Sequence, residues 1–204
     1  MNGVGDRLEL AGICLGLAGE AEAVVDHLAE TRPAVLALGV APELVDELHL
    51  LEPDDHLGGE DAAYVRGLSR WGDVALPGPE FPEATARARE MGVRVVGIDL
   101  GEIDYLDLYS DTISYGRMLR RSFKLRRLVR RPPRAADPHA FCRAFDRTLN
   151  HGPYAQLEQR RERTMAERLG ELVAAGPVLA VVEVQRLDGI REELQRTWAG
   201  ARAR

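Results

Sequence analysis

The stretch that decides the predicted fold is Val178-Leu179-Ala180-Val181-Val182-Glu183-Val184-Gln185-Arg186-Leu187-Asp188-Gly189-Ile190. Its first part, Val178–Val182, is short, apolar and rich in β-branched residues, and Gly176-Pro177 comes directly before it. This pattern favours a buried strand over part of a helix, because strands are short and are bounded by glycine and proline. The stretch therefore predicts a core strand, a short loop and the start of a new helix.

Polar side chains stand where this strand gives way to the helix. Asp188 can cap a helix that runs through Trp198, because its carboxylate accepts from backbone N–H groups that lack partners in the first turn. Glu183 and Arg186 come just before that helix. Open α/β folds usually carry their chemistry outside the carboxyl ends of the strands, so we expect a site here.

The rest of the chain alternates between strand and helix patterns. Short apolar runs predict strands at Leu8–Gly12, Ala34–Val40 and Val93–Asp99. Apolar residues at helical spacing predict helices at Glu20–Thr31, Pro42–His49, Glu60–Leu68, Phe81–Met91, Pro138–Leu149 and Pro153–Ala174, and one or two helices over Tyr105–Arg131. The first two strands, joined by a helix, are expected to pair in parallel as a right-handed β-α-β unit.

These elements predict an α/β fold with a central, mainly parallel sheet and helices packed around it. Strand-loop-helix units occur at both ends of the chain, over Leu8–Leu28 and Leu179–Ala199. With 204 residues the chain can bury a substantial core, and we expect one domain, 1–204, with a helical insert at 105–150. An apolar stripe in that insert is expected to face the core, formed by Tyr115, Met118, Leu119, Leu125, Leu128 and Val129.

Composition excludes several classes of protein. Every apolar run is cut by charge before the roughly 20 residues that a membrane-spanning helix needs. The N-terminus carries no basic region followed by an apolar core, so we expect a cytoplasmic protein. A net charge of −6 argues against nucleic-acid binding over the whole surface. Cys14 and Cys142 stand in unrelated contexts, which supports neither a disulfide framework nor a zinc site.

Two regions carry a resemblance to a known family. One is a helix followed by the last strand, with Arg161-Glu162, Met165-Ala166 and the tail residues Leu187, Gly189 and Ile190. The other is a helix opened by Pro77-Gly78-Pro79-Glu80, with Ala84 and Ala88 on one face, before a strand that ends in Ile98-Asp99. Together they resemble the TraB/PrgY family, which is distantly related to the Tiki metal-dependent proteases. The resemblance extends over most of the chain, roughly Leu8 to Leu194.

The resemblance implies a metal site built from two histidines and a glutamate, and this chain departs from it at all three positions. Leu15, three residues after Gly12, stands at the first histidine position, Gly39 at the glutamate position and Arg186 at the second histidine position. Glu183 replaces a glycine of the family motif. Leucine and glycine offer no ligating side chain, and a guanidinium repels a cation. We therefore expect a pseudoenzyme that has lost the family's metal site and has no cofactor.

Charged residues remain around the expected site: Glu80, Asp99, Arg161, Glu162, Glu183 and Arg186. They are predicted to cluster near the carboxyl edge of the sheet, where buried charges must pair. One interpretation is structural, with Arg161 paired to Asp99 or Glu80 and Arg186 paired to Glu183. In a second, Arg161 and Arg186 bind an anionic ligand such as a carboxylate or phosphate. In a third, catalysis uses Glu80, Asp99, Arg161, Glu162 and Glu183.

A basic stretch follows in the helical insert, with Arg117, Arg120, Arg121, Lys124, Arg126, Arg127, Arg130, Arg131 and Arg134. Such a density of positive charge can bind phosphates or an anionic membrane surface. It can also be a solvated helix face that pairs with the acidic loop Glu52–Asp61 or with a partner subunit. Both interpretations stay open at this point.

The leading hypothesis for function is a TraB-like binding or regulatory protein without catalysis. Its expected partners are a small anionic ligand or peptide at Arg161 and Arg186, and a second copy of the chain that covers the apolar stripe. One alternative is a hydrolase, peptidase-like and metal-assisted or not, that uses the surviving carboxylates Glu80, Asp99, Glu162 and Glu183. Another is an anion or nucleic-acid binder that uses Arg117–Arg134.

Overall fold

Four parallel strands form one central sheet in the computed structural model, which describes residues 7–54 and 57–202. Their order across the sheet is β1-β4-β2-β3, with bounds β1 (Leu8–Ile13), β4 (Val178–Glu183), β2 (Val35–Leu38) and β3 (Arg94–Gly97). Each pair of neighbours is parallel. The predicted α/β class with a parallel central sheet is confirmed.

The strand quoted first, β4, lies inside the sheet. It pairs with β1 through Leu8↔Val178 and with β2 through Val35↔Val178, so β1 and β2 are not hydrogen-bonded to each other. The predicted direct pairing of the first two strands is therefore wrong. The reason lies in burial: Val178 to Val182 are all buried, whereas β1 has the exposed Glu9, and a strand that is apolar on both faces belongs inside a parallel sheet.

Helices surround the sheet, and most agree with the sequence prediction to within a few residues. Their bounds are α1 (Glu20–Thr31), α2 (Gly59–Leu68), α3 (Glu80–Glu90), α4 (Glu102–Thr112), α5 (Tyr115–Arg130), α6 (Pro138–Leu149), α7 (Pro153–Leu172) and α8 (Leu187–Arg202). Two short 3-10 helices, η2 (Pro42–Asp46) and η3 (Leu48–Leu50), follow β2. Of these helices, α4 and α5 cover the segment where one or two were expected.

Two local predictions are wrong for identifiable reasons. The single helix expected at Pro42–His49 is instead η2 and η3, in which Val45 and Leu48 are buried three residues apart, the period of a 3-10 helix. Asp188 does not cap α8, because the helix already begins at the buried Leu187. Its carboxylate lies 3.7 Å from Arg143 and 3.5 Å from Arg191.

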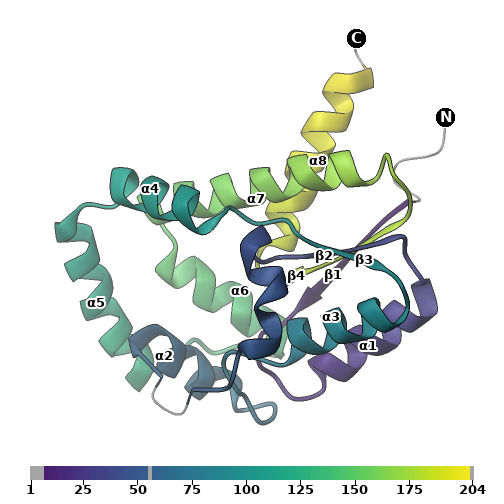
Figure 1. Cartoon of the computed structure of the whole chain (residues 1–204). Coiled ribbons are helices and arrows are strands. Elements are labelled where there is room, and N and C mark those ends of the chain that lie inside the picture. Colours follow the sequence, from purple (N-terminus) through teal and green to yellow (C-terminus); the bar gives the residue numbers. More distant parts are fainter. Residues whose placement is uncertain (1–6, 55–56, 203–204) are drawn as a thin grey trace.

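Two hydrophobic layers enclose the sheet. In Figure 1, α1 and α3 lie on one face, and α7 and α8 lie on the other. Side chains alternate accordingly along β2, where Leu36 and Leu38 join the cluster with α1 and α3, and Val35 and Ala37 join the cluster with α7 and α8. The amphipathic helices thus bury both faces of a sheet that cannot face water.

A second group of helices, α2, α4, α5 and α6, forms an arc beside the sheet (Figure 1). Its core is aromatic, with the ring of Phe141 5.7 Å from that of Phe145 and 5.8 Å from that of Trp71. Gly67 permits this packing, because a Cβ atom there would lie 2.2 Å from the Phe141 ring. The arc extends the fold past the sheet edge and leaves space between the two parts.

The apolar stripe predicted on α5 is only half buried. Leu128 is 6% exposed and packs in the core, whereas Tyr115 is 79% and Leu119 50% exposed. Only the C-terminal half of α5 lies next to α2 (Figure 1). Among residues 7–54 and 57–202, no helix has both the length and the apolar character needed to cross a lipid bilayer.

Candidate functional site at the carboxyl edge of the sheet

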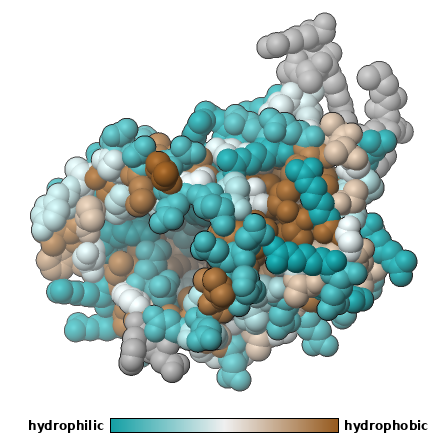
Figure 2. All heavy atoms as spheres, in the orientation of Figure 1, coloured by the Kyte–Doolittle hydropathy of each residue, from teal (hydrophilic) through white to brown (hydrophobic). Residues whose placement is uncertain are grey.

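A cavity of about 510 Å³ lies where the sheet edge meets the arc of helices. Its walls come from the loop after β4, from α2, α5, α6 and α7, and from residues near the end of β1. On the face shown in Figure 2, hydrophilic side chains surround a hollow in the molecule. Parallel α/β sheets commonly bind ligands outside the carboxyl ends of their strands, so this cavity is the candidate site.

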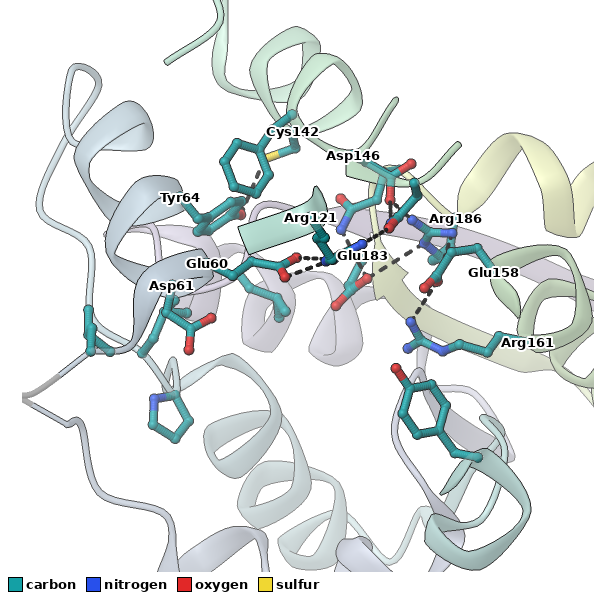
Figure 3. Close-up of a pocket in the computed structure, with 18 of the residues that line it drawn as sticks. Glu60, Asp61, Tyr64, Arg121, Cys142, Asp146, Glu158, Arg161, Glu183 and Arg186 are labelled. Atoms are coloured by element: carbon teal, nitrogen blue, oxygen red, sulfur yellow. Dashed lines mark hydrogen bonds and ion pairs between the residues drawn. The ribbon is translucent and has the colours of Figure 1, made fainter. Parts of the chain in front are cut away.

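The turn after β4 carries the polar residues predicted for this place. The N–H of Val184 donates to the carbonyl of Ile13 at 2.9 Å, and the N–H of Arg186 donates to the carbonyl of Glu183 at 2.9 Å. The first bond extends the pairing of β4 with β1, and the second closes a tight turn before α8. Glu183 and Arg186 consequently point into the cavity from the strand end (Figure 3).

Arg186 is the centre of a buried ion-pair network. Its side chain is 3% exposed, and one guanidinium nitrogen lies 3.0 Å from both Glu158 and Glu162. The other terminal nitrogen pairs with Asp146, and Nε lies 3.7 Å from Glu183. Figure 3 shows Arg186 beside Asp146, Glu158 and Glu183. The expected contact with Glu183 is present, but it is the longest of the four.

Arg161 forms the second centre of the network. Its Nε donates to Asp99 at 3.0 Å and its Nη1 donates to Glu158 at 2.8 Å. Glu158 thus bridges the two arginines. The sequence left the partner of Arg161 open between Asp99 and Glu80, and the structure selects Asp99.

Glu80 lies apart from this network. Its Oε1 accepts the N–H of Gly16 at 2.6 Å, across the opening turn of α3. The other oxygen is buried and has no hydrogen-bond partner among the described residues. Burial raises the pKa of Glu80, which favours a protonated side chain in this place. Of the charged residues expected to cluster, Glu80 is the one that the structure places elsewhere.

Three further residues of the network were missed by the sequence analysis: Asp146, Glu158 and Arg121. Glu158 lies one helical turn before Arg161 and Glu162, and this i, i+3 and i, i+4 spacing on α7 could have indicated a shared face. Arg121 belongs to the basic stretch, yet its Nη2 donates to both carboxylate oxygens of Glu60 at 2.9 and 2.7 Å. The predicted pairing of the basic stretch with the acidic loop Glu52–Asp61 is present at this contact.

Arg121 is held in place from several sides. Its Nη1 donates to Asn150 at 2.9 Å, and Asn150 in turn donates to Asp146 at 2.8 Å. Its guanidinium stacks over the Tyr154 ring at 4.4 Å. This chain of contacts links the α2 and α5 wall of the cavity to Arg186 on the opposite wall.

Burial shifts several pKa values in the site. Burial, and to a smaller extent the negative charge of Glu158, raise the pKa of Glu162 to about 8. Burial also raises the pKa of Glu158 and of Glu183, although Arg161 opposes the shift at both. It lowers the pKa of Arg186 to about 10, which still leaves the guanidinium protonated at neutral pH. The carboxyl groups are therefore the part of the network that can exchange protons.

Carboxylates outnumber arginines around the cavity. Six line it, namely Asp54, Glu60, Asp61, Asp146, Glu158 and Glu183, against three arginines, Arg121, Arg161 and Arg186. Each arginine is engaged by at least one carboxylate. Asp61 is exposed to solvent. Partial desolvation by the surrounding protein, and to a smaller extent the negative charge of Glu60, raise its pKa. An incoming ligand therefore meets a surplus of acidic groups.

The three positions at which the resemblance implies metal ligands carry a leucine, a glycine and an arginine. Leu15 lines the cavity with an apolar side chain. At Gly39 a Cβ atom would lie 3.2 Å from the Cα of Val182, so β2 and β4 approach closely where the resemblance implies a glutamate. Arg186 fills the remaining position with a cation. Comparison with models of known protein families gives no match, and neither does comparison with curated protein sequences.

Proposed function

We propose that this chain is a binding or regulatory protein with TraB-like architecture, without the family's metal site, and that it binds a small positively charged ligand in the cavity at the sheet edge. The observation that carries this proposal is the surplus of carboxylates around arginines that already have acidic partners. An amine or guanidinium compound, or the basic side chain of a peptide, has this chemistry.

The ligand proposed here has the opposite charge to the one expected from the sequence alone. Arg161 and Arg186 were expected to bind an anion, but Arg161 already binds Asp99 and Glu158, and Arg186 has four carboxylates within 4.0 Å. An anionic ligand would have to displace these groups and leave them buried without a partner, which is costly. A cation instead gains partners from groups such as Glu183 and Asp61.

Calorimetric titration with charged probes tests this proposal. L-arginine and spermidine are expected to bind, whereas L-glutamate and inorganic phosphate are not. Glu183→Gln and Asp61→Asn should each weaken cation binding about 10-fold, because each removes one charge-assisted hydrogen bond. Glu167→Gln, at an exposed position of α7, is the matched control and should bind like the wild type. Binding of phosphate or glutamate alone would contradict the proposal.

A hydrolase is the second candidate, and it has one observation in its favour. Burial raises the pKa of Glu158 and Glu183, both at the cavity, and an upward shift moves a carboxyl group toward the range in which it can act as a general acid. This candidate predicts turnover of peptide or ester substrates that Glu183→Gln abolishes and Glu167→Gln preserves. Absence of turnover over a broad substrate panel would leave the binding protein as the better explanation.

A further inference from the structure

Two helix starts and one strand end meet at Cys14, Glu20 and His139. Cys14 follows β1 directly and is fully buried, and its N–H donates to the carboxylate of Glu20 at 3.2 Å. Glu20 is the first residue of α1. His139 stands in the first turn of α6, with Nε2 4.0 Å from the same carboxylate oxygen. The sequence places Cys14 and His139 more than a hundred residues apart, and the fold brings them together.

The ligating atoms of these three residues converge. The sulfur of Cys14, a carboxylate oxygen of Glu20 and a ring nitrogen of His139 all lie within 4.8 Å of one another. In residues 7–54 and 57–202, this is the one group of three such side chains that meets that condition. Ligands of one tetrahedral zinc ion, bound at about 2.0–2.3 Å, lie roughly 3.3–3.8 Å apart. Small side-chain movements would therefore bring these atoms to coordination distance.

The surroundings suit a metal ion that enters from solvent. Cys14 provides a buried anchor, whereas the side chain of Glu20 is 16% and that of His139 48% exposed. One helical turn after His139, Cys142 lies on the same side of α6, and its sulfur contacts the Tyr64 hydroxyl at 3.2 Å.

We propose that Cys14, Glu20 and His139 form a binding site for a divalent transition metal ion of the zinc type. A thiolate, a carboxylate and an imidazole are the donor types that zinc accepts in proteins, and the soft sulfur donor disfavours magnesium and calcium. The site is separate from the position of the family's metal ligands, because Leu15, Gly39 and Arg186 take no part in it. It goes beyond the proposed binding function.

The ion would connect three elements, of which α6 is far from the other two in the sequence. Cys14 belongs to the end of β1, Glu20 to the start of α1 and His139 to the start of α6. Helix α6 also carries Asp146, a partner of Arg186 in the cavity. A metal ion here would hold α6 against the sheet edge and so keep one wall of the cavity in position.

Cobalt titration of the whole chain, reduced and stripped of metal, tests the proposal. One equivalent of Co²⁺ is expected to bind and to give a sulfur-to-cobalt charge-transfer band, which Zn²⁺ then removes by displacement. Zn²⁺ is also expected to raise the melting temperature, because it binds the folded state. Cys14→Ser should abolish the charge-transfer band, and His139→Ala should weaken Co²⁺ binding by at least about 10-fold.

His49→Ala is the matched control, since His49 is an exposed histidine of η3 far along the chain from this group, and it should bind Co²⁺ like the wild type. Because His139 is exposed, the His139→Ala variant is expected to fold and to decide the matter even if Cys14→Ser does not fold. Co²⁺ binding without a charge-transfer band, or binding that His139→Ala leaves unchanged, would overturn the proposal.

Discussion

Arginine side chains in two regions of this protein have opposite environments. Arg161 and Arg186 lie at the sheet edge with side chains 18% and 3% exposed, and each has at least two carboxylate partners. On α5, by contrast, Arg120, Arg126 and Arg127 are exposed to solvent. The same residue type therefore serves as an internal cation in one region and as a surface charge in the other, and the density of arginine in the sequence does not locate the site.

The comparison is tested most strongly by Arg186→Met. Removal of the buried guanidinium leaves the partly buried carboxylates of Asp146, Glu158 and Glu162 close together without their shared cation, which should lower the free energy of unfolding by about 3–5 kcal/mol. Urea denaturation at pH 7 measures this change. Arg120→Met on α5 is the matched control and should change the free energy by less than about 0.5 kcal/mol. Equal effects of the two substitutions would remove the distinction between the regions.

Arg121 belongs to the basic stretch by sequence and to the cavity by structure. Its substitution should therefore lower the free energy of unfolding by an amount between those expected for Arg186→Met and Arg120→Met. Arg121→Met loses the paired hydrogen bonds to Glu60 and the bond to Asn150. Because Glu60 is partly exposed and can be solvated, we expect a loss of about 1–2 kcal/mol. Arg117→Met, on the same helix, provides the comparison in the same denaturation experiment. A loss no greater than that of Arg117→Met would place Arg121 with the surface arginines.

The pH dependence of the free energy of unfolding tests whether Glu162 holds a proton in the folded protein. The pKa of Glu162 is about 8 in the folded protein, above its unfolded value, so its contribution to stability is present at low pH and declines as pH rises toward and through 8. Glu162→Gln removes this dependence. The free energy of unfolding should therefore fall less steeply between pH 5 and 9 in Glu162→Gln than in the wild type, by an amount that urea denaturation across this range measures. Parallel curves would show that Glu162 does not hold a proton in the folded protein.

Substitution of the exposed apolar residues of α5 is expected to have the smallest effect on stability, and to act instead on the association of two copies of the chain. We propose that the exposed apolar side chains of α5, together with those of α4, are covered by a second copy of the chain. They are Ile103, Leu106, Tyr115, Met118, Leu119 and Phe123. The double variant Tyr115→Ser, Phe123→Ser should halve the mass found by light scattering and change monomer stability by less than about 0.5 kcal/mol. A wild-type protein that is monomeric at high concentration would disprove this association.

Much of the fold followed from local patterns. The run Val178–Val182 predicted a buried strand, because a short, apolar run of β-branched residues suits a strand better than a helix. The helix predicted at Phe81–Met91 is α3, and Gly92, with φ near +70°, follows its end. The order of strands did not follow. The placement of β4 between β1 and β2 depends on which strand loses most by facing water, and that comparison involves residues far apart in the chain.

The candidate site was predicted in part. Asp99, Arg161, Glu162, Glu183 and Arg186 do meet, because the carboxyl ends of parallel strands and the helix α7 converge at one edge. The sequence did not place Asp146 or Arg121 at this cavity, because their positions depend on how α5 and α6 fold back over it. The site's surplus of negative charge became visible only once these residues and the acidic residues of α2 were in place.

By itself, the sequence determined most of the secondary structure, the α/β class and the chemical types available at the strand ends, since these follow from short-range periodicity, turn residues and side-chain identity. Only the tertiary structure decided which charges are buried together, because pairing energies depend on distance and burial and not on spacing along the chain. For that reason Arg186 became the centre of a carboxylate network, and Cys14 and His139, distant in sequence, came to share one small volume.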